Sequence, residues 1–126
     1  MYTQSLPNLG PPTASVLPQI QVFRHINFNR QLGDRNPEGD KPTDENILTT
    51  FNVDLDGDDL NEGISSFIIY SGYWQFFKNV GFQDPFPKIY GPGHYPKTAD
   101  IGMENDTISS FKLFSVEKPA HPDVYQ

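Results

Sequence analysis

Asn105-Asp106-Thr107-Ile108-Ser109-Ser110 stands directly before an alternating segment, residues 111–114. A near copy, Asn61-Glu62-Gly63-Ile64-Ser65-Ser66, stands before the apolar residues 67–70. Each copy has an Asn, a carboxylate, two spacers and two serines at the start of a predicted strand. Oxygen-rich side chains in a short loop suit a hard cation such as calcium, which takes about 6–8 oxygen ligands. They also suit a plain polar turn, in which Asx turns form and the serines bond backbone amides.

The composition predicts one all-β domain. The chain has 126 residues, of which twelve are Pro and ten are Gly. No long segment free of Pro and Gly shows a clean helical period, so short strands and many turns are expected. There is no Cys, which excludes disulfides, thiolate metal sites and cysteine nucleophiles.

The charge distribution disfavours polyanionic partners. The formal net charge is −7, and ten Asp or Glu residues lie between positions 34 and 62 against only Arg35 and Lys41. Nucleic acids and anionic membrane surfaces need clustered Lys and Arg, so neither is an expected partner. No apolar run is long enough to span a membrane, and the N-terminus does not resemble a signal peptide. We expect a soluble protein, with the cytoplasm favoured over secretion and a monomer or weak homodimer as its state.

Alternation and turn residues divide the chain into short strands. Strands are expected at 19–24, 47–53, 65–70, 73–78, 88–90 and 111–114, with an edge segment at 94–96. Ile20 and Val22 should share one face of the first strand. The proline-rich residues 1–18 are expected to be an extension, residues 34–45 an acidic loop, and residues 117–126 a tail.

The two halves of the chain repeat. Residues 23–30 match residues 77–84 as aromatic, basic, polar, aliphatic, polar or small, Phe, amide and polar. The first unit is about ten residues longer between its aromatic bend and its serines, and the excess falls in the acidic loop. A four-stranded unit with a long return connection is a Greek key, and two such units form a β-sandwich with one core.

This pattern resembles the βγ-crystallin superfamily over residues 19–116, with one Greek key at 19–70 and a second at 73–116. Calcium-binding members carry an Asn/Asp–Asn/Asp–two spacers–Ser/Thr–Ser motif in each key. The Asn105 copy fits fully, and the Asn61 copy fits except for Glu62. Residues 74–114 are similar to microbial and invertebrate members. The family's bend usually ends in Gly, where Arg30 and Asp84 stand here, so we expect the first hairpin to be distorted.

The resemblance implies two calcium ions, each shared between the repeats. One site would use the Gly63 carbonyl, the Ser65 hydroxyl, the Asp106 carboxylate and a carbonyl near Arg24. The other would use the Thr107 carbonyl, the Ser109 hydroxyl, the Glu62 carboxylate and a carbonyl near Lys78. Water would complete both sites, and so few charged ligands imply modest affinity. Glu62 is one methylene longer than the usual Asp, which leaves open whether it binds directly, through water or poorly.

Other functions find weaker support. A hydrolase triad could be drawn from His25, His94 or His121 with Ser65 and Asp106, but no nucleophile elbow is present and no enzyme is expected. Residues 54–65 begin like an EF-hand loop yet lack its Gly and its final Glu, which leaves at most a weak additional ion site.

Two alternatives to calcium binding stay open. The motifs could be turns of a calcium-insensitive structural protein. The domain could also be a recognition module whose acidic loop or aromatic surface binds a protein or a glycan. The aromatic candidates for such a surface are Tyr73, Trp74, Phe76 and Phe77, of which Trp74 and Phe76 are expected in the core because they alternate.

Overall fold

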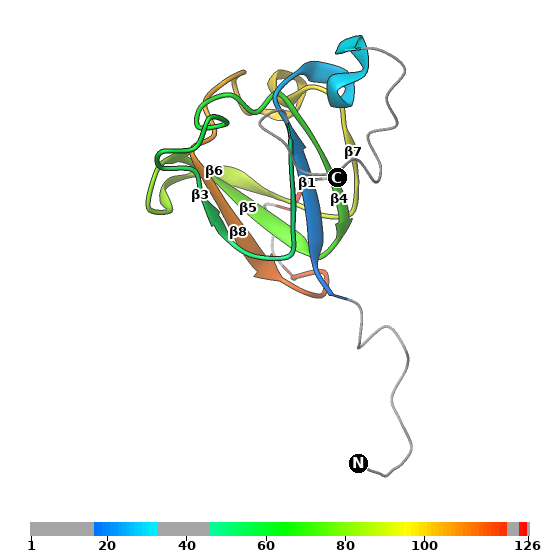
Figure 1. The fold of residues 1–126 in the computed structure, drawn as a ribbon. Helices are drawn as coiled ribbons and strands as arrows, with labels where there is room; N and C mark the ends of the chain where they lie inside the picture. The colour runs from blue at the N-terminus through cyan, green and yellow to red at the C-terminus, as the bar shows by residue number, and fades with distance from the viewer. Residues whose placement is uncertain (1–16, 33–45, 121–123, 126) are drawn as a thin grey trace, which may run out of the picture.

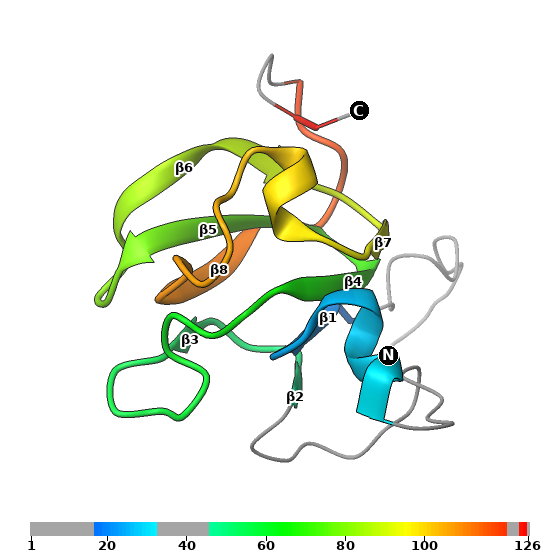
Figure 2. The ribbon, with the colours of Figure 1, turned by 90° about the horizontal axis from the view of Figure 1, so that it is seen from above.

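The computed structural model describes residues 17–32, 46–120 and 124–125. Two antiparallel four-stranded sheets pack face to face, with strand orders β2-β1-β4-β7 and β3-β8-β5-β6 (Figures 1 and 2). The strands are β1 (Gln19–Phe23), β2 (Asn46–Thr49), β3 (Val53–Asp54), β4 (Ser66–Ser71), β5 (Tyr73–Asn79), β6 (Gln83–Tyr90), β7 (Gly93–Tyr95) and β8 (Ser110–Ser115). Two 3-10 segments complete the elements, namely η2 (Ile26–Leu32) and η3 (Thr98–Ile101).

The two repeats exchange one strand each. β3 belongs to the first repeat but pairs with β8 of the second, where Val53 lies opposite Phe111. β7 belongs to the second repeat but pairs with β4 of the first, where Phe67 lies opposite Tyr95. The predicted β-sandwich of two Greek keys is therefore confirmed, and neither sheet is complete without the other repeat.

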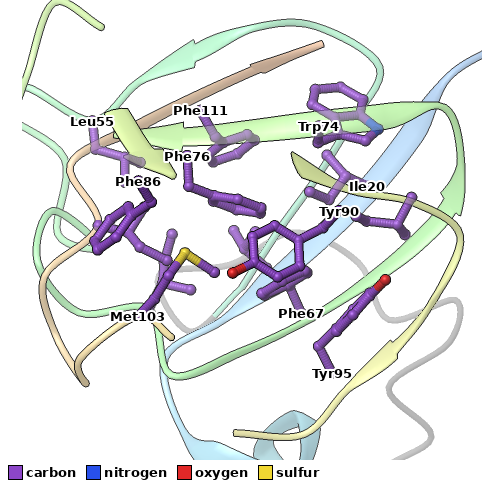
Figure 3. Packing of buried hydrophobic residues seen from close by; sticks show 14 of the residues in the cluster. Ile20, Leu55, Phe67, Trp74, Phe76, Phe86, Tyr90, Tyr95, Met103 and Phe111 are labelled. Atoms are coloured by element: carbon purple, nitrogen blue, oxygen red, sulfur yellow. The ribbon is translucent and has the colours of Figure 1, made fainter. Parts of the chain in front are cut away.

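Aromatic rings fill the space between the sheets (Figure 3). Phe67 lies at the centre, with its ring centroid 4.6 Å from those of both Phe76 and Tyr95. Ile20 and Val22 are fully buried on one face, as the alternation predicts. Trp74 and Phe76 are also fully buried, so these two residues belong to the core and do not form an exposed glycan platform.

Two strand boundaries differ from the prediction. The expected strand at 47–53 is split, because β2 and β3 belong to opposite sheets and the chain must cross between them. A local turn marks the crossing, where the Phe51 N–H donates to the Thr49 hydroxyl at 2.9 Å. The expected strand at 88–90 starts earlier, at Gln83. β6 is an edge strand, which tolerates the missing N–H groups of its prolines.

The two aromatic bends also differ, as expected from Arg30 and Asp84. Asp84 adopts the left-handed conformation (φ 57°) in place of the usual Gly, and the chain continues into β6. In the first repeat the left-handed residues are Asn27, Phe28 and Asn29, and the chain enters η2 instead of a paired strand. The acidic loop at 34–45, most of the extension at 1–18 and part of the tail lie outside the described residues.

Candidate metal centre

The second serine of each motif holds an aromatic bend in place. The buried Ser66 hydroxyl accepts from the Phe28 N–H at 3.1 Å and donates to the His25 carbonyl at 2.6 Å. The buried Ser110 hydroxyl accepts from the Phe82 N–H at 3.2 Å and donates to the Asn79 carbonyl at 2.8 Å. These two serines therefore serve the structural role that the polar-turn interpretation predicts.

Loss of this hydroxyl should destabilise the domain without removing any candidate metal ligand. We expect Ser110→Ala to lower the free energy of unfolding by about 2 kcal/mol, because two hydrogen bonds of the Ser110 hydroxyl, to the Phe82 N–H and the Asn79 carbonyl, are lost. Ser66→Ala should cost a similar amount. Ser115→Ala, on the same strand but partly exposed, is the control and should change stability by less than about 0.5 kcal/mol. Urea unfolding measures all three, and equal values for Ser110→Ala and Ser115→Ala would contradict the assignment.

The first serine of each motif places the two loops side by side. The Ser65 N–H donates to the Phe23 carbonyl and the Ser109 N–H to the Phe77 carbonyl, each at 2.9 Å. The Ser65 hydroxyl donates across the repeats to Asp106 Oδ1 at 3.4 Å. Asp106 is also oriented by its neighbour, since Asn105 Nδ2 donates to Asp106 Oδ2 at 3.2 Å. A carboxylate from one repeat thus lies against a serine from the other.

The carboxylate positions of the two motifs have the same backbone conformation. Glu62 has φ 59° and Asp106 has φ 62°, both in the left-handed region. Asp and Asn enter this region more readily than Glu, because their short polar side chains can bond locally. The first motif therefore places a less suitable residue at a position that the fold holds left-handed.

Shortening Glu62 should relieve this strain. We expect Glu62→Asp to raise the free energy of unfolding in calcium-free buffer by roughly 0.5–1 kcal/mol. Glu117→Asp makes the same chemical change at an exposed residue outside the motifs and should leave stability unchanged. Denaturant unfolding in the presence of a chelator measures both. A destabilised Glu62→Asp would show that the longer side chain contributes contacts that outweigh the backbone strain.

The first hollow, which we name hollow one, has a volume of about 430 Å³. The four residues predicted to bind the first calcium ion, Arg24, Gly63, Ser65 and Asp106, all line this hollow. It is lined by Arg24, His25, Ile26, Asn61, Glu62, Gly63, Ser65, Asn105 and Asp106. The buried Asn61 Oδ1 has no hydrogen-bond partner in the described chain, and a buried oxygen without a donor is costly unless a cation or water satisfies it. The residues present therefore fit a hard cation.

The second hollow, hollow two, has a volume of about 500 Å³ and matches its predicted ligand set less well. It is lined by Glu62, Lys78, Phe86, Pro87, Gly102, Glu104, Asp106 and Thr107. Ser109 does not line it and is only 2% exposed. Lys78 also brings a cation to its wall, with Nζ 5.5 Å from the centre of the Phe86 ring. Hollow two thus brings Glu62, Thr107 and Lys78 together, whereas Ser109 is not part of its lining.

A cationic side chain also borders hollow one. Arg24 Nη2 donates to the Asp59 carbonyl at 3.2 Å. Arg24 Nη1 lies 3.4 Å from the position that a Cβ on Gly63 would take. This guanidinium therefore packs on the loop of the first motif and lowers the negative potential there, which limits cation affinity.

The described residues do not bring three His, Cys, Asp or Glu side chains together in a metal-binding cluster. The donors at hollow one are instead carboxylate, hydroxyl, amide and carbonyl oxygens, which suit calcium or magnesium more than a soft metal. Two acids of the EF-hand-like loop accept backbone hydrogen bonds. Asp58 accepts from the nearby Leu60 N–H at 2.8 Å, whereas Asp54 accepts from the Gly81 N–H of the second repeat at 2.9 Å.

The histidines do not form the conceivable triad in the part of the chain that the structure covers. The Ser65 hydroxyl donates to Asp106, so it does not donate to an imidazole. His25 lines hollow one, whereas His94 on β7 contacts the Phe28 ring edge-on at 5.9 Å. His121 lies outside the described residues.

Comparisons with known proteins agree on one family. A family model described as Beta/Gamma crystallin matches residues 47–114. A beta/gamma-crystallin from Ciona intestinalis is 38% identical over 65 residues, which span 52% of this chain and 76% of that protein.

Solved structures of the same family resemble the fold. A βγ-crystallin from an archaeon has a TM-score of 0.59 at 26% identity, covering 79% of this chain and 100% of its own. A transition-metal-ion-binding βγ-crystallin from Methanosaeta thermophila has a TM-score of 0.56 at 26% identity, covering 75% and 99%. None of the helical segments in the described chain is long and apolar enough to cross a membrane.

Proposed function

The chain belongs to the beta/gamma-crystallin family, and on this premise we propose that it binds calcium, which stabilises the fold. One observation carries the proposal. The Asp106 carboxylate of the second repeat lies against the Ser65 hydroxyl of the first, in a hollow that is also lined by Asn61, whose buried Oδ1 has no hydrogen-bond partner in the described chain. A cation bound there would link the two repeats through Asp106 and Ser65.

Hollow one is the stronger of two proposed sites. Asp106, Ser65 and the Gly63 and Arg24 carbonyls would hold the ion, with water completing its shell. In hollow two, Glu62 and the Thr107 carbonyl would be the main ligands, with Ser109 and the Lys78 carbonyl behind them. The longer Glu62 side chain and the Lys78 ammonium both weaken the second site, so we propose unequal affinities.

A second candidate ion follows from His25, which is among the residues that line hollow one. One structural relative is described as transition-metal-ion-binding, and imidazole with carboxylate suits such metals. Calcium remains the preferred ion, because oxygens outnumber nitrogens among the donors at this hollow. Catalysis is not proposed, since Ser65 donates to Asp106 and not to a histidine.

Calcium should raise the thermal midpoint of unfolding by mass action. A ligand at about 100 times its Kd stabilises the folded state by about 2.7 kcal/mol. For a domain of this size, that corresponds to a shift of roughly 8–15 °C. Scanning calorimetry with and without millimolar calcium measures the shift, with magnesium and zinc as matched ions and a chelator to reverse it. An unchanged midpoint with calcium would contradict the proposal, and a shift with zinc alone would favour the transition-metal site.

A further inference from the structure

A short C-terminal segment lies along the free edge of the second sheet. Val124 forms a parallel bridge with Ile89, and the Tyr125 N–H donates to the Ile89 carbonyl at 2.7 Å. β6 is the edge strand of this sheet. Pro85 and Pro87 have no N–H groups, so the strand cannot offer a full ladder to a neighbour. Ile89 is the position where an added strand pairs.

The Tyr125 side chain occupies an aromatic slot next to this bridge. Its ring stacks on Tyr90 at 5.3 Å and lies edge-on to Tyr95 at 6.2 Å. Both slot tyrosines are fixed from behind, since the Tyr90 hydroxyl donates to the Ile101 carbonyl and the Tyr95 hydroxyl to the Gly91 carbonyl, each at 2.7 Å. The two tyrosines that form the slot are therefore held by the sandwich itself.

The segment leaves part of this surface uncovered. A hollow of about 380 Å³ adjoins Val124 and Tyr125 and is also walled by Tyr73, Gly91, Pro92 and Lys118. Gly91 is required here, because a Cβ at this position would lie 2.4 Å from the Tyr73 ring. Rings and backbone rather than long flexible side chains thus form most of the surface. Such a surface can bind a chain segment with little loss of side-chain entropy.

We propose that the edge of β6 at Ile89, with Tyr90 and Tyr95, is a binding site for an extended peptide that carries an aliphatic residue followed by an aromatic one. Residues 124–125 are its intramolecular ligand. The arrangement matches strand addition, in which main-chain bonds supply affinity and side-chain slots supply specificity. The site shares no residue with hollow one or hollow two, so its test does not require calcium.

The test uses the full chain with its own segment disabled. The probe is a synthetic peptide with the sequence of residues 117–126, and the protein carries Val124→Ser and Tyr125→Ala. A tethered segment has an effective concentration of about a millimolar, so we expect the free peptide to bind this variant with a Kd on the order of 0.1–1 mM. Amide shifts of Ile89 and Tyr90 in heteronuclear NMR spectra report the binding. The wild-type chain should bind the peptide about two- to tenfold more weakly, because its slot is filled for most of the time.

A peptide carrying Tyr125→Ala is the matched control and should cause no shifts. The proposal fails if the folded variant does not respond to the intact peptide at millimolar concentration. It also fails if the intact and control peptides bind equally well. If the double variant does not fold, the single Tyr125→Ala chain, which keeps Val124 against Ile89, replaces it in the same titration.

Discussion

Replacing Asp106 with Ala is expected to lower the calcium affinity of hollow one by at least about tenfold, which corresponds to about 1.4 kcal/mol of binding free energy. Asp106 supplies the carboxylate oxygen that lies 3.4 Å from the Ser65 hydroxyl. Removing it takes away the main charged ligand and leaves mostly neutral oxygens beside Arg24. Calorimetric titration of calcium into the wild type and the variant measures the change.

Further variants are needed to separate the loss of the Asp106 charge from the effect of backbone strain on calcium affinity. Ala at φ 62° is itself strained, so part of any loss could come from the loop conformation. Asp106→Asn keeps an oxygen and tolerates the left-handed conformation, and we expect it to lose less affinity than Asp106→Ala. Glu62→Ala should weaken hollow two more than hollow one. Equal losses at both sites in every variant would contradict the assignment of one carboxylate to each.

Raising the pH from 10 to 12 is expected to lower the free energy of unfolding strongly, because two buried tyrosines resist ionisation in the folded state. Burial, followed by the neighbouring Tyr125 and then Tyr95, raises the pKa of Tyr90 to about 12 from 10.0. Burial, followed by Tyr125 and Tyr73, likewise raises the pKa of Tyr95 to about 12. Both phenols are therefore neutral in the folded state across a range where the unfolded chain ionises.

The sign of the change in stability with pH follows from how many protons the folded and unfolded states bind. Below pH 10 both states hold the protons, and the stabilisation from the shifted pKa values is fully present. Between pH 10 and 12 the folded state holds more protons, so stability falls by at most about 1.4 kcal/mol per pH unit for each tyrosine, and solvent screening reduces this figure.

Urea unfolding at several pH values between 9 and 12 gives the slope. Tyr90→Phe removes one of the two titrating phenols and should reduce the slope by about half. The substitution also loses the hydrogen bond to the Ile101 carbonyl, which costs about 1 kcal/mol at every pH. The slope is therefore the diagnostic quantity, and a slope equal to that of the wild type would contradict the role of Tyr90.

Much of the fold could be predicted from the repeated motif. The two serine motifs and the two aromatic bends recur at matching distances, and the structure confirms two Greek keys from them. The alternation that places Ile20, Val22, Trp74 and Phe76 in the core is also confirmed. Strand exchange could not be derived from alternation, because β-prone residues at 47–53 do not indicate that the chain changes sheets halfway.

The sequence alone could not assign different structural roles to the two serines of each motif. Ser65 and Ser66 are adjacent and chemically identical, yet Ser66 bonds the bend and Ser65 faces Asp106. The two hydroxyls have different partners because successive residues entering a strand point to opposite faces. The packing of Val124 and Tyr125 on β6 was also beyond prediction, because two residues after a proline-containing tail give no periodic signal.

The most direct test of the account is a crystal structure grown with calcium, in which anomalous scattering locates the ions. The account predicts an ion in hollow one, bound by Asp106 and Ser65, and a weaker peak in hollow two beside Glu62 and Thr107. The Asp106→Ala protein under the same conditions should lose the first peak. Calcium bound only at residues 54–59 of the EF-hand-like loop would contradict the account. The absence of calcium from both hollows at millimolar concentration would also contradict it.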